Sequence, residues 1–349
     1  MEKRCHVAVF SYLCTLKTDI ESETSTYDNN VCRNGHRLRQ CPEREGMNGM
    51  YIAFAPLQGY TDAVYRRAHR ECAGGVDEYY TPFVRIEKGE IRKKDLRDTA
   101  PAANEGVPTV PQVIARDGDE FALLCDTLQR QGWRRIDLNM GCPFPMQVHA
   151  GRGSGLLTHI VHIEEIQQEM RHRPEVTFSI KMRLGWESES EALTAMPIIN
   201  EMPLMHVTLH PRLGRQQYKG VADREAFMRF MEVCRHPMVY NGDIVEMKNE
   251  ESRMKNRAGA NHKGVMIGRG LLARPWMLCD REPAQVLRDM HAVIYRHAEE
   301  NLCGDSQILS RLHAFWEYVD IDRKAKKAIL KATSLPRYRE AVAAAVNSL

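Results

Sequence analysis

Short apolar runs alternate with amphipathic segments along most of this chain. From Tyr51 onward, runs rich in β-branched and aromatic residues are followed by stretches in which apolar residues return every three or four positions. This alternation is typical of a parallel α/β architecture, because parallel strands are joined by crossover helices. The pattern predicts eight strands, at residues 51–57, 78–84, 109–114, 135–140, 177–182, 206–210, 238–241 and 264–268.

Several of the intervening segments have the periodicity of amphipathic helices. In one of them Phe227, Phe230 and Cys234 fall on one helical face, as expected of a helix that packs on a core. Eight β/α units between Tyr51 and Gly268 favour an α/β fold of the (β/α)8 TIM-barrel type. The clearest helical segments are residues 61–72, 120–131, 160–171 and 224–234.

A doubly wound dinucleotide-binding sheet is the alternative fold. It would need a glycine-rich turn after an early strand and an acidic residue about 20 positions later. The glycine-rich run at residues 151–155 instead follows the fourth predicted strand and lacks that acidic partner. The barrel is therefore the favoured fold.

The chain divides into three predicted parts. Residues 1–48 mix a short apolar piece with a polar run, and we expect a disordered leader or an over-extended start there. Residues 49–280 are predicted to form the barrel, as a catalytic domain. Beyond Trp276 the strand pattern stops, and residues 281–349 are predicted to form an all-helical domain with helices at 284–301, 307–319, 323–331 and 337–346.

Composition narrows the class of protein. Hydrophobic residues make up 43% and charged residues 27% of the chain, which is typical of a soluble globular protein. No run approaches the ~18 apolar residues that a membrane helix needs. The net charge of +3 is too small to indicate RNA binding, so any positive surface for RNA must be local.

The ten cysteines are scattered, and none forms a C-x-x-C pair. This spacing favours reduced thiols in a cytoplasmic protein. Cys32, His36 and Cys41 resemble half of a metal site, but no second pair of ligands completes it. No metal site is therefore predicted.

Polar residues and glycines collect where the predicted strands end, the face on which barrel enzymes carry their active sites. Side-chain amides can pair with the donor and acceptor edge of a flavin ring, and a lysine can stabilise reduced, anionic flavin. Backbone amides on the seventh and eighth strands match the usual phosphate position in barrels. This set suits a flavin. It consists of Pro56-Leu57-Gln58, Gln112, Asn139 with Cys142, Lys181 with Arg183, His210 with Arg212, Asn241-Gly242-Asp243 and Gly268-Arg269-Gly270.

Taken together, these motifs resemble the tRNA-dihydrouridine synthase family. The most characteristic run is Asp-Leu-Asn-Met-Gly-Cys-Pro at 137–143, which is followed by a glycine-rich segment that ends at Leu157. The motifs occur in the family's order and cover residues 51 to about 277. The others are APLQGYTD at 55–62, PQV at 111–113, SIKMRLG at 179–185, HPR at 210–212, YKG at 218–220, YNGDI at 240–244 and GRG at 268–270.

The resemblance implies a role for each matching residue. Cys142 falls on the family's catalytic cysteine, and Asn139 is expected beside the target uracil, with Arg183 and Arg212 as further substrate contacts. FMN is the implied cofactor, and NADPH or NADH the implied reductant. The implied FMN contacts are Pro56, Leu57, Gln58, Gln112, Lys181, His210, Asn241, Gly242, Asp243, Gly268 and Arg269.

The chain departs from the family's pattern in two places. Leu57 and Gln58 stand where Met and Ala or Glu are commoner, and Leu is close to Met in volume. Pro211-Arg212-Leu213 replaces a more usual Gly-Arg-Thr, and Pro211 removes a backbone donor beside His210.

The implied reaction is reduction of the C5=C6 bond of uracil. It needs a hydride at C6, expected from N5 of reduced FMN, and a proton at C5 from an acid on the other face of the base. A thiol with a pKa of about 8.5 is still largely protonated at neutral pH and can supply that proton. Cys142, between Gly141 and Pro143 at a strand end, fits this role better than that of a small buried hydrophobe.

The helical tail is predicted to bind tRNA. Basic residues gather between Arg323 and Arg339 with few acids among them, and after such a barrel this favours phosphate contacts over a solvated helix face. Lys326 and Lys327 are the assigned contacts. Residues 80–85 and the tail are most similar to the bacterial C-type subgroup, which suggests an early D-loop uridine as the target.

Two other functions stay open at this point. A dihydropyrimidine or dihydroorotate type of FMN barrel would also need a cysteine or serine acid, but its free-base substrate would not require the basic tail. A tRNA-binding barrel without catalysis would not need Cys142, Lys181 and Arg269. The sequence indicates no membrane association and no protein partner, and we expect a monomer.

Overall fold

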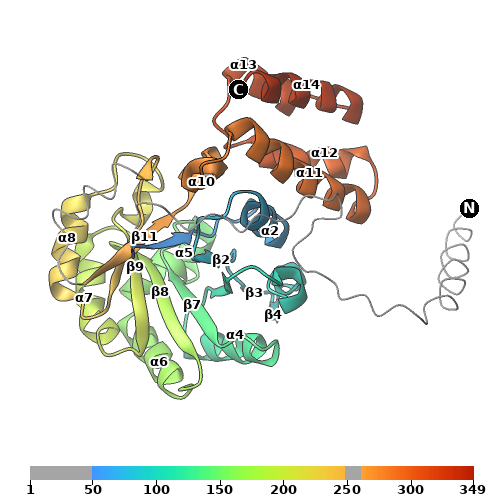
Figure 1. The fold of residues 1–349 in the computed structure, drawn as a ribbon. Helices are drawn as coiled ribbons and strands as arrows, with labels where there is room; N and C mark the ends of the chain where they lie inside the picture. Colours follow the sequence, from blue (N-terminus) through green and yellow to red (C-terminus); the bar gives the residue numbers. More distant parts are fainter. Residues whose placement is uncertain (1–48, 248–260) are drawn as a thin grey trace, which may run out of the picture. The chain divides into compact units, whose positions relative to one another are not determined.

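The computed structural model describes residues 49–247 and 261–349, which form a barrel of parallel strands followed by a helical tail (Figure 1). Hydrogen-bonded neighbours run in the order β5-β2-β1-β11-β10-β9-β8-β7-β6. These strands are β1 (Tyr51–Phe54), β2 (Glu78–Tyr80), β5 (Thr109–Val110), β6 (Gln112–Val113), β7 (Arg135–Met140), β8 (Thr177–Arg183), β9 (Leu204–His210), β10 (Met238–Tyr240) and β11 (His262–Ile267).

The sheet closes on itself through a single segment of chain. β5 pairs with β2 and β6 pairs with β7, and only Pro111 separates β5 from β6. Proline has no N–H to donate, so the strand is interrupted there, but the Pro111 carbonyl still accepts a hydrogen bond from Asp137 N at 2.9 Å. With β5 and β6 counted as one strand, the sheet is an eight-stranded barrel, and the predicted (β/α)8 fold is confirmed.

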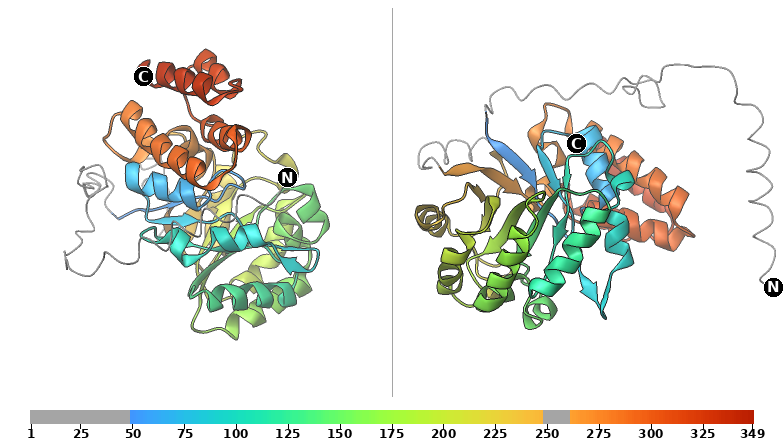
Figure 2. Two further views of the ribbon diagram at one scale, coloured as in Figure 1. Left: turned by 90° about the vertical axis from the view of Figure 1, so that its right-hand side faces the viewer. Right: turned by 90° about the horizontal axis from the view of Figure 1, so that it is seen from below.

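Helices lie on the outside of this barrel, as two further views show (Figure 2). Three of them begin after an aspartate, Asp62, Asp117 or Asp223, whose carboxylate accepts a backbone N–H of the first turn. Because Asp117 is the cap, the second of these helices starts two residues before the predicted position. The helices are α2 (Ala63–Cys72), α4 (Gly118–Arg130), α6 (Ile160–Arg171), α7 (Glu189–Ile199) and α8 (Arg224–Val233); shorter elements are the β3 (Ile86–Glu87) and β4 (Glu90–Ile91) hairpin, α3 (Lys93–Asp98), α5 (Pro145–His149) and α10 (Arg269–Ala273).

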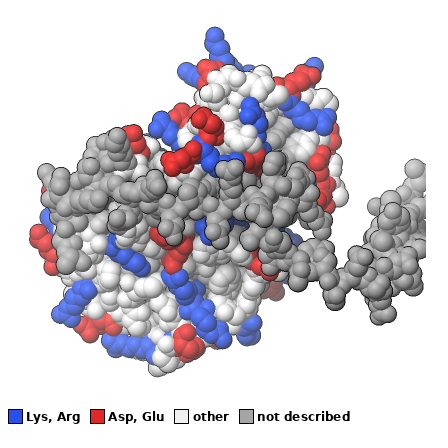
Figure 3. Space-filling model, viewed as in Figure 1, with Lys and Arg blue, Asp and Glu red and all other residues white. Residues whose placement is uncertain are grey.

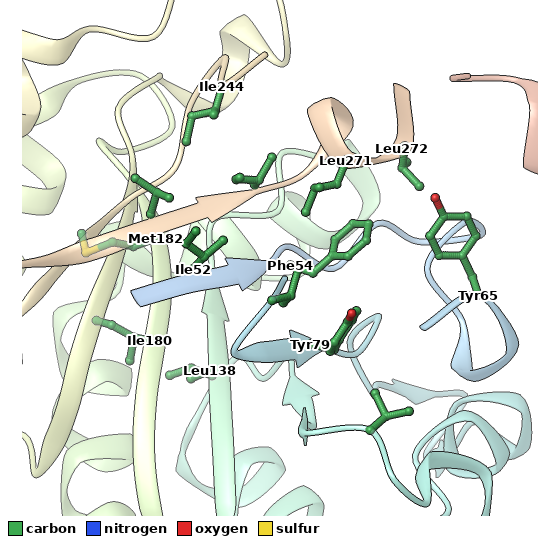
Figure 4. Packing of buried hydrophobic residues seen from close by; sticks show 14 of the residues in the cluster. Ile52, Phe54, Tyr65, Tyr79, Leu138, Ile180, Met182, Ile244, Leu271 and Leu272 are labelled. Atoms are coloured by element: carbon green, nitrogen blue, oxygen red, sulfur yellow. The ribbon is translucent and has the colours of Figure 1, made fainter. Parts of the chain in front are cut away.

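On β7 and β8, strand residues alternate between an apolar outer face and a polar inner face, whereas β1, β5, β10 and β11 place a second, smaller apolar cluster inside the barrel. On β7 and β8, Leu138, Ile180 and Met182 are fully buried in the main core, which lies between the strands and the helices (Figure 4). Their neighbours Asp137 and Ser179 hydrogen-bond to each other across the inner face. On these two strands, period-two alternation therefore places the apolar residues under the helices and the polar residues inside the barrel.

A polar cluster fills the amino-terminal end of the barrel interior. Tyr51 donates to the Glu78 carboxylate at 2.6 Å, and Tyr80 lies 3.1 Å from Nε2 of His206. Lys263 can only donate, so its 3.2 Å contact makes Nδ1 of His206 the acceptor and leaves the proton on Nε2. Burial lowers the pKa of His206 to about 3, which agrees with a neutral ring. The cluster closes the end of the barrel opposite the strand ends where the predicted site lies.

The tail consists of four helices that continue the core of the barrel. Its first helix packs on α2, and buried residues of both parts belong to one apolar cluster. Arg311 pairs with Asp62 at 2.7 Å, and Tyr318 meets Tyr60 edge to face at 4.8 Å between ring centroids. The helices are α11 (Pro283–Asn301), α12 (Asp305–Trp316), α13 (Arg323–Leu330) and α14 (Leu335–Asn347), close to the predicted positions.

The expectations for the leader and for Cys32, His36 and Cys41 fall on residues 1–48, outside the described residues. Within 49–247 and 261–349, none of the helices combines the length and the apolar character needed to span a bilayer.

We expect Tyr338→Phe to destabilise the protein by about 1–3 kcal/mol, because the buried Tyr338 hydroxyl accepts from Trp316 Nε1 at 2.7 Å and lies 2.7 Å from Nε2 of His291. Urea unfolding measures the change. Tyr65→Phe is the matched control, since the buried Tyr65 hydroxyl has no hydrogen-bond partner in the described part of the chain. Equal losses in both variants would contradict the assigned hydrogen bonds.

Candidate active site

The strand ends bring most of the predicted site residues to one face of the barrel. Register pairs Asn139 of β7 with Lys181 of β8, and Arg183 of β8 with His210 of β9. Gln112, on β6, hydrogen-bonds to Asn139 at 2.8 Å. Lys326 and Lys327 lie apart from this group, in α13 of the tail.

Cys142 is held by hydrogen bonds on both sides of its backbone. Its N–H donates to Oδ1 of Asn139 at 2.8 Å, and its carbonyl accepts from the N–H and the hydroxyl of Ser154 at 3.1 and 3.0 Å. Ser154 was not among the predicted site residues. Its place in the glycine-rich run at 151–155 was the available signal, because that run packs directly on Cys142.

Gly153 explains why this run is rich in glycine. Its φ of +59° lies in the left-handed region, and a Cβ at this position would stand 2.6 Å from the carbonyl oxygen of Cys142. The glycine-rich segment therefore serves to approach the cysteine closely.

The Cys142 thiol is half-buried and stays protonated at neutral pH. Burial raises its pKa, although the Phe144 backbone and the cations of Arg183 and Lys181 oppose that rise. A thiol in this state is a proton donor rather than a nucleophile.

Two basic groups on this face of the barrel, Lys181 and His210, have lowered pKa values. Burial and then the Arg183 cation lower the pKa of Lys181 to about 8, with Asp137 acting in the opposite direction. Burial and the surrounding cations hold the pKa of His210 well below its usual range, so its ring is neutral. Nη1 of Arg212 lies 3.1 Å from Nε2 of His210, and because arginine only donates, the His210 proton is on Nδ1.

Asp243 joins two of the predicted arginines. Its carboxylate accepts from Arg212 at 2.5 Å and from Arg269 at 3.1 Å. Burial would raise the pKa of Asp243, but the hydrogen bonds from Arg212 and the Ala222 N–H hold it below its usual range. The two Nη groups of the buried Arg212 thus donate to protein groups, while its buried Nε has no hydrogen-bond partner in the described part of the chain. Arg269 is 38% exposed, and its side-chain hydrogen bond is the one from Nη2 to Asp243.

Tyr218 lies against two guanidinium groups at the mouth of the site. Arg269 stands 4.4 Å and Arg183 5.5 Å from its ring centroid, and half of its side chain is exposed. The motif at 218–220 was noted in the sequence, but no role was assigned to its tyrosine. Its ring offers a surface for a planar group.

The three loops expected to meet the cofactor through their backbones lie at the ends of β1, β10 and β11. The Leu57 N–H is already bonded to Thr61 Oγ1 at 2.8 Å, and Gln58 reaches the Phe83 carbonyl at 3.2 Å. Asn241 donates its side-chain amide to the Met266 carbonyl at 2.7 Å, which ties the two strands where Gly242 follows. Gly268 precedes α10, whose first turn has no side-chain cap.

Comparison with known proteins agrees with this geometry. The family model described as "Dihydrouridine synthase (Dus)" matches residues 53–340. A probable tRNA-dihydrouridine synthase of Rickettsia bellii is 28% identical over 282 residues, covering 76% of this chain and 84% of that protein. A tRNA-dihydrouridine(16) synthase of Neisseria meningitidis serogroup B is 33% identical over 233 residues (64% and 68%), and tRNA-dihydrouridine synthase B of Pseudomonas aeruginosa is 26% identical over 287 residues (76% and 82%).

The fold, the site and the family match together define a barrel oxidoreductase. The chain belongs to the dihydrouridine synthase family, whose tRNA-dihydrouridine synthases are flavin-dependent oxidoreductases acting on the C5=C6 bond of uridine. The resemblance drawn from the sequence motifs is confirmed at the level of the family.

The pKa of Lys181 gives the protein without flavin a distinctive pH dependence. Its folded-state pKa of about 8 lies below the ordinary 10.5, so between these values the unfolded chain binds the extra proton. Stability therefore rises with pH in this window. Urea unfolding should show the stability of the wild type increasing relative to Lys181→Met between pH 8 and pH 10, whereas a constant difference would contradict a desolvated lysine.

Proposed function

We propose that this chain reduces the C5=C6 bond of a D-loop uridine in tRNA, with FMN bound at the strand ends and NADPH or NADH as the reductant. The observation that carries the proposal is Cys142, a protonated thiol with its backbone held on both sides, next to Asn139. It lies within the segment that matches the family.

The residues present suit an FMN. Lys181 is a cation whose pKa is lowered by burial. An anionic flavin ring beside it would stabilise its positive charge. Arg269 retains donors near the uncapped start of α10, which suits a phosphate. The proposed contacts are those expected from the sequence, with Gln112, Lys181 and His210 through their side chains and the loops at 56–58, 241–243 and 268–269. When bound, FMN supplies the hydride that arrives at C6.

The chain's own residues do the rest. The Cys142 thiol would give the proton to C5 of the base. Asn139, Arg183 and Arg212 are the proposed contacts to the base. Arg212 also holds Asp243 and His210 through its Nη groups. The half-exposed Tyr218 ring offers a stacking surface for a base turned out of the tRNA.

The target we propose is uridine 16. Two supports are the similarity of residues 80–85 and the tail to the C-type subgroup and the 33% identity to a relative named for position 16. We place the reaction in the cytoplasm, with the chain acting as a monomer. Cys125, Cys142, Cys234 and Cys303 carry free thiols, which suits that compartment.

A free-base oxidoreductase is the second candidate, and the tail distinguishes the two. A small substrate would not require contacts from the basic residues of α13. Figure 3 shows Lys and Arg side chains projecting at the upper end of this face, where Figure 1 places α13. Activity on free uracil exceeding activity on tRNA would favour that candidate.

Cys142→Ala should lower dihydrouridine formation by roughly 100- to 10,000-fold, because general acid catalysis is lost. Mass spectrometry of tRNA nucleosides measures the product. Flavin absorbance and tRNA affinity should stay as in the wild type, which separates a lost proton donor from a damaged site. Cys125→Ala, a buried thiol outside the site, is the control, and full activity in Cys142→Ala would reject the mechanism.

Lys326→Glu combined with Lys327→Glu should weaken tRNA binding about 10-fold or more while FMN stays bound, because phosphate contacts of α13 are lost. Filter binding at fixed salt measures the affinity. Lys93→Glu with Lys94→Glu is the matched control, since this pair of adjacent exposed lysines lies in α3. An equal loss in both double variants would show an effect of net charge and contradict a tRNA site in the tail.

A further inference from the structure

Asp137 is a fully buried carboxylate that has no role in the proposed reaction described above. It lies on the inner face of β7, in register with Gln112 of β6 and Ser179 of β8. The Ser179 hydroxyl donates to its Oδ1 at 2.6 Å, and Nε2 of Gln112 donates to its Oδ2 at 2.7 Å. Each carboxylate oxygen therefore has a specific partner.

From Gln112 the hydrogen bonds continue to Cys142. Nδ2 of Asn139 donates to Oε1 of Gln112 at 2.8 Å. Oδ1 of Asn139 accepts from Gly141 N at 3.0 Å and from Cys142 N at 2.8 Å. One chain of hydrogen bonds thus joins the buried carboxylate to the backbone of the proposed acid.

The backbone N–H end of this chain has a role that cannot be reversed, and the Asp137 end has a fixed role while its carboxylate is ionised. An ionised carboxylate only accepts, and a backbone N–H only donates. The two amides between them can therefore satisfy all their partners in only one orientation. Gln112 must turn its nitrogen toward Asp137, and Asn139 must turn its oxygen toward Cys142.

This orientation limits what Asn139 can offer to a ligand. Its oxygen already accepts two hydrogen bonds, so both lone pairs are in use. Its nitrogen has donated one of its two N–H groups to Gln112. The remaining group is a single N–H donor.

We propose that Asp137 is a positioning residue that, through Gln112, turns the Asn139 amide so that its oxygen holds the Cys142 backbone and only an N–H faces the substrate. The inference rests on the proposed function, because the ligand at Asn139 is taken to be the target base. A donor at this position selects a base that presents a carbonyl oxygen, as uracil does at O2 and O4. An exocyclic amino group there would set donor against donor.

The charge of Asp137 has support within the barrel. Burial raises its pKa to about 7, while the hydrogen bonds from Ser179 and Gln112 and the Lys181 cation oppose the rise. Lys181 and Asp137 thus stabilise each other's charged forms, and the lysine proposed to meet the flavin also supports the carboxylate that orients the amides.

Two substitutions at Asp137 separate positioning from charge. Asp137→Asn keeps an acceptor for Gln112, and the Ser179 hydroxyl can reverse its role and accept from the new amide. Asp137→Leu has the same number of side-chain heavy atoms, branched at the same carbon, and no acceptor. We expect Asp137→Leu to lower kcat for tRNA by roughly 10- to 100-fold, because a buried donor loses its partner, and Asp137→Asn to stay within about threefold of the wild type. Equal losses in both variants would overturn positioning in favour of a role for the charge or the proton.

A swap of acceptor and amide tests the orientation itself. Asn139→Asp alone places Gln112 between two carboxylates. Gln112 has one amide nitrogen to donate, so one of the two carboxylates must face the amide oxygen of Gln112. Adding Asp137→Asn supplies an N–H at the other end and lets the whole chain run in reverse through a turned Gln112. The double variant should return the thermal stability and the alkylation rate of Cys142, both changed in Asn139→Asp, to wild-type values. Reduction of tRNA should stay low, because position 139 no longer offers an N–H. Additive losses would overturn the proposal.

The alkylation arm uses iodoacetamide and peptide mass spectrometry at Cys142, so it needs neither flavin nor tRNA. Asp95→Leu is the matched control: Asp95 is another buried aspartate, in α3, and its loss should leave the Cys142 alkylation rate unchanged. A wild-type protein that forms no dihydrouridine would reject the proposed function alone. An unchanged alkylation rate in Asp137→Leu would reject the role of Asp137 alone.

Discussion

The two hydrogen bonds that Oδ1 of Asn139 accepts from the backbone of Gly141 and Cys142 are the constraint on which the site depends. They fix the turn that follows β7. The hydroxyl and the N–H of Ser154 fix the carbonyl side of Cys142. A thiol on a freely moving loop would meet the target carbon only rarely. Held in this way, Cys142 is preorganised for proton transfer before substrate arrives.

The polar interior of the barrel makes this arrangement possible. Inner positions carry Asp137, Ser179 and Lys181, whereas the outer positions between them are apolar and packed under helices. Stability therefore comes mainly from the core outside the strands, and the interior is available for hydrogen-bonded groups. The same burial that stabilises the fold lowers the pKa of Lys181 and raises that of Cys142.

The local patterns predicted most of the fold because each is a short-range signal. The period-two run at 135–140 is β7 without change, and the helix at 160–171 is α6. Some errors arose where a cap or a proline decides: Asp117 starts α4 two residues before the predicted position, and Pro111 divides the third strand. The strands predicted at 51–57 and 78–84 are also shorter, since β1 ends at Phe54 and β2 at Tyr80. The motifs also predicted which residues gather at the strand ends, but Ser154, Tyr218 and Asp137 were given no role, since their contacts join segments distant in the chain.

The sequence by itself determined the barrel, the family and the strand-end residues, because periodicity and motif order are properties of the linear chain. Only the tertiary structure decided the direction of each amide, the proton position on His210 and the protonation states of Lys181 and Cys142. Those properties depend on which groups meet across β6, β7, β8 and β9 and on how much water burial removes. Neither can be predicted from a single segment of the sequence.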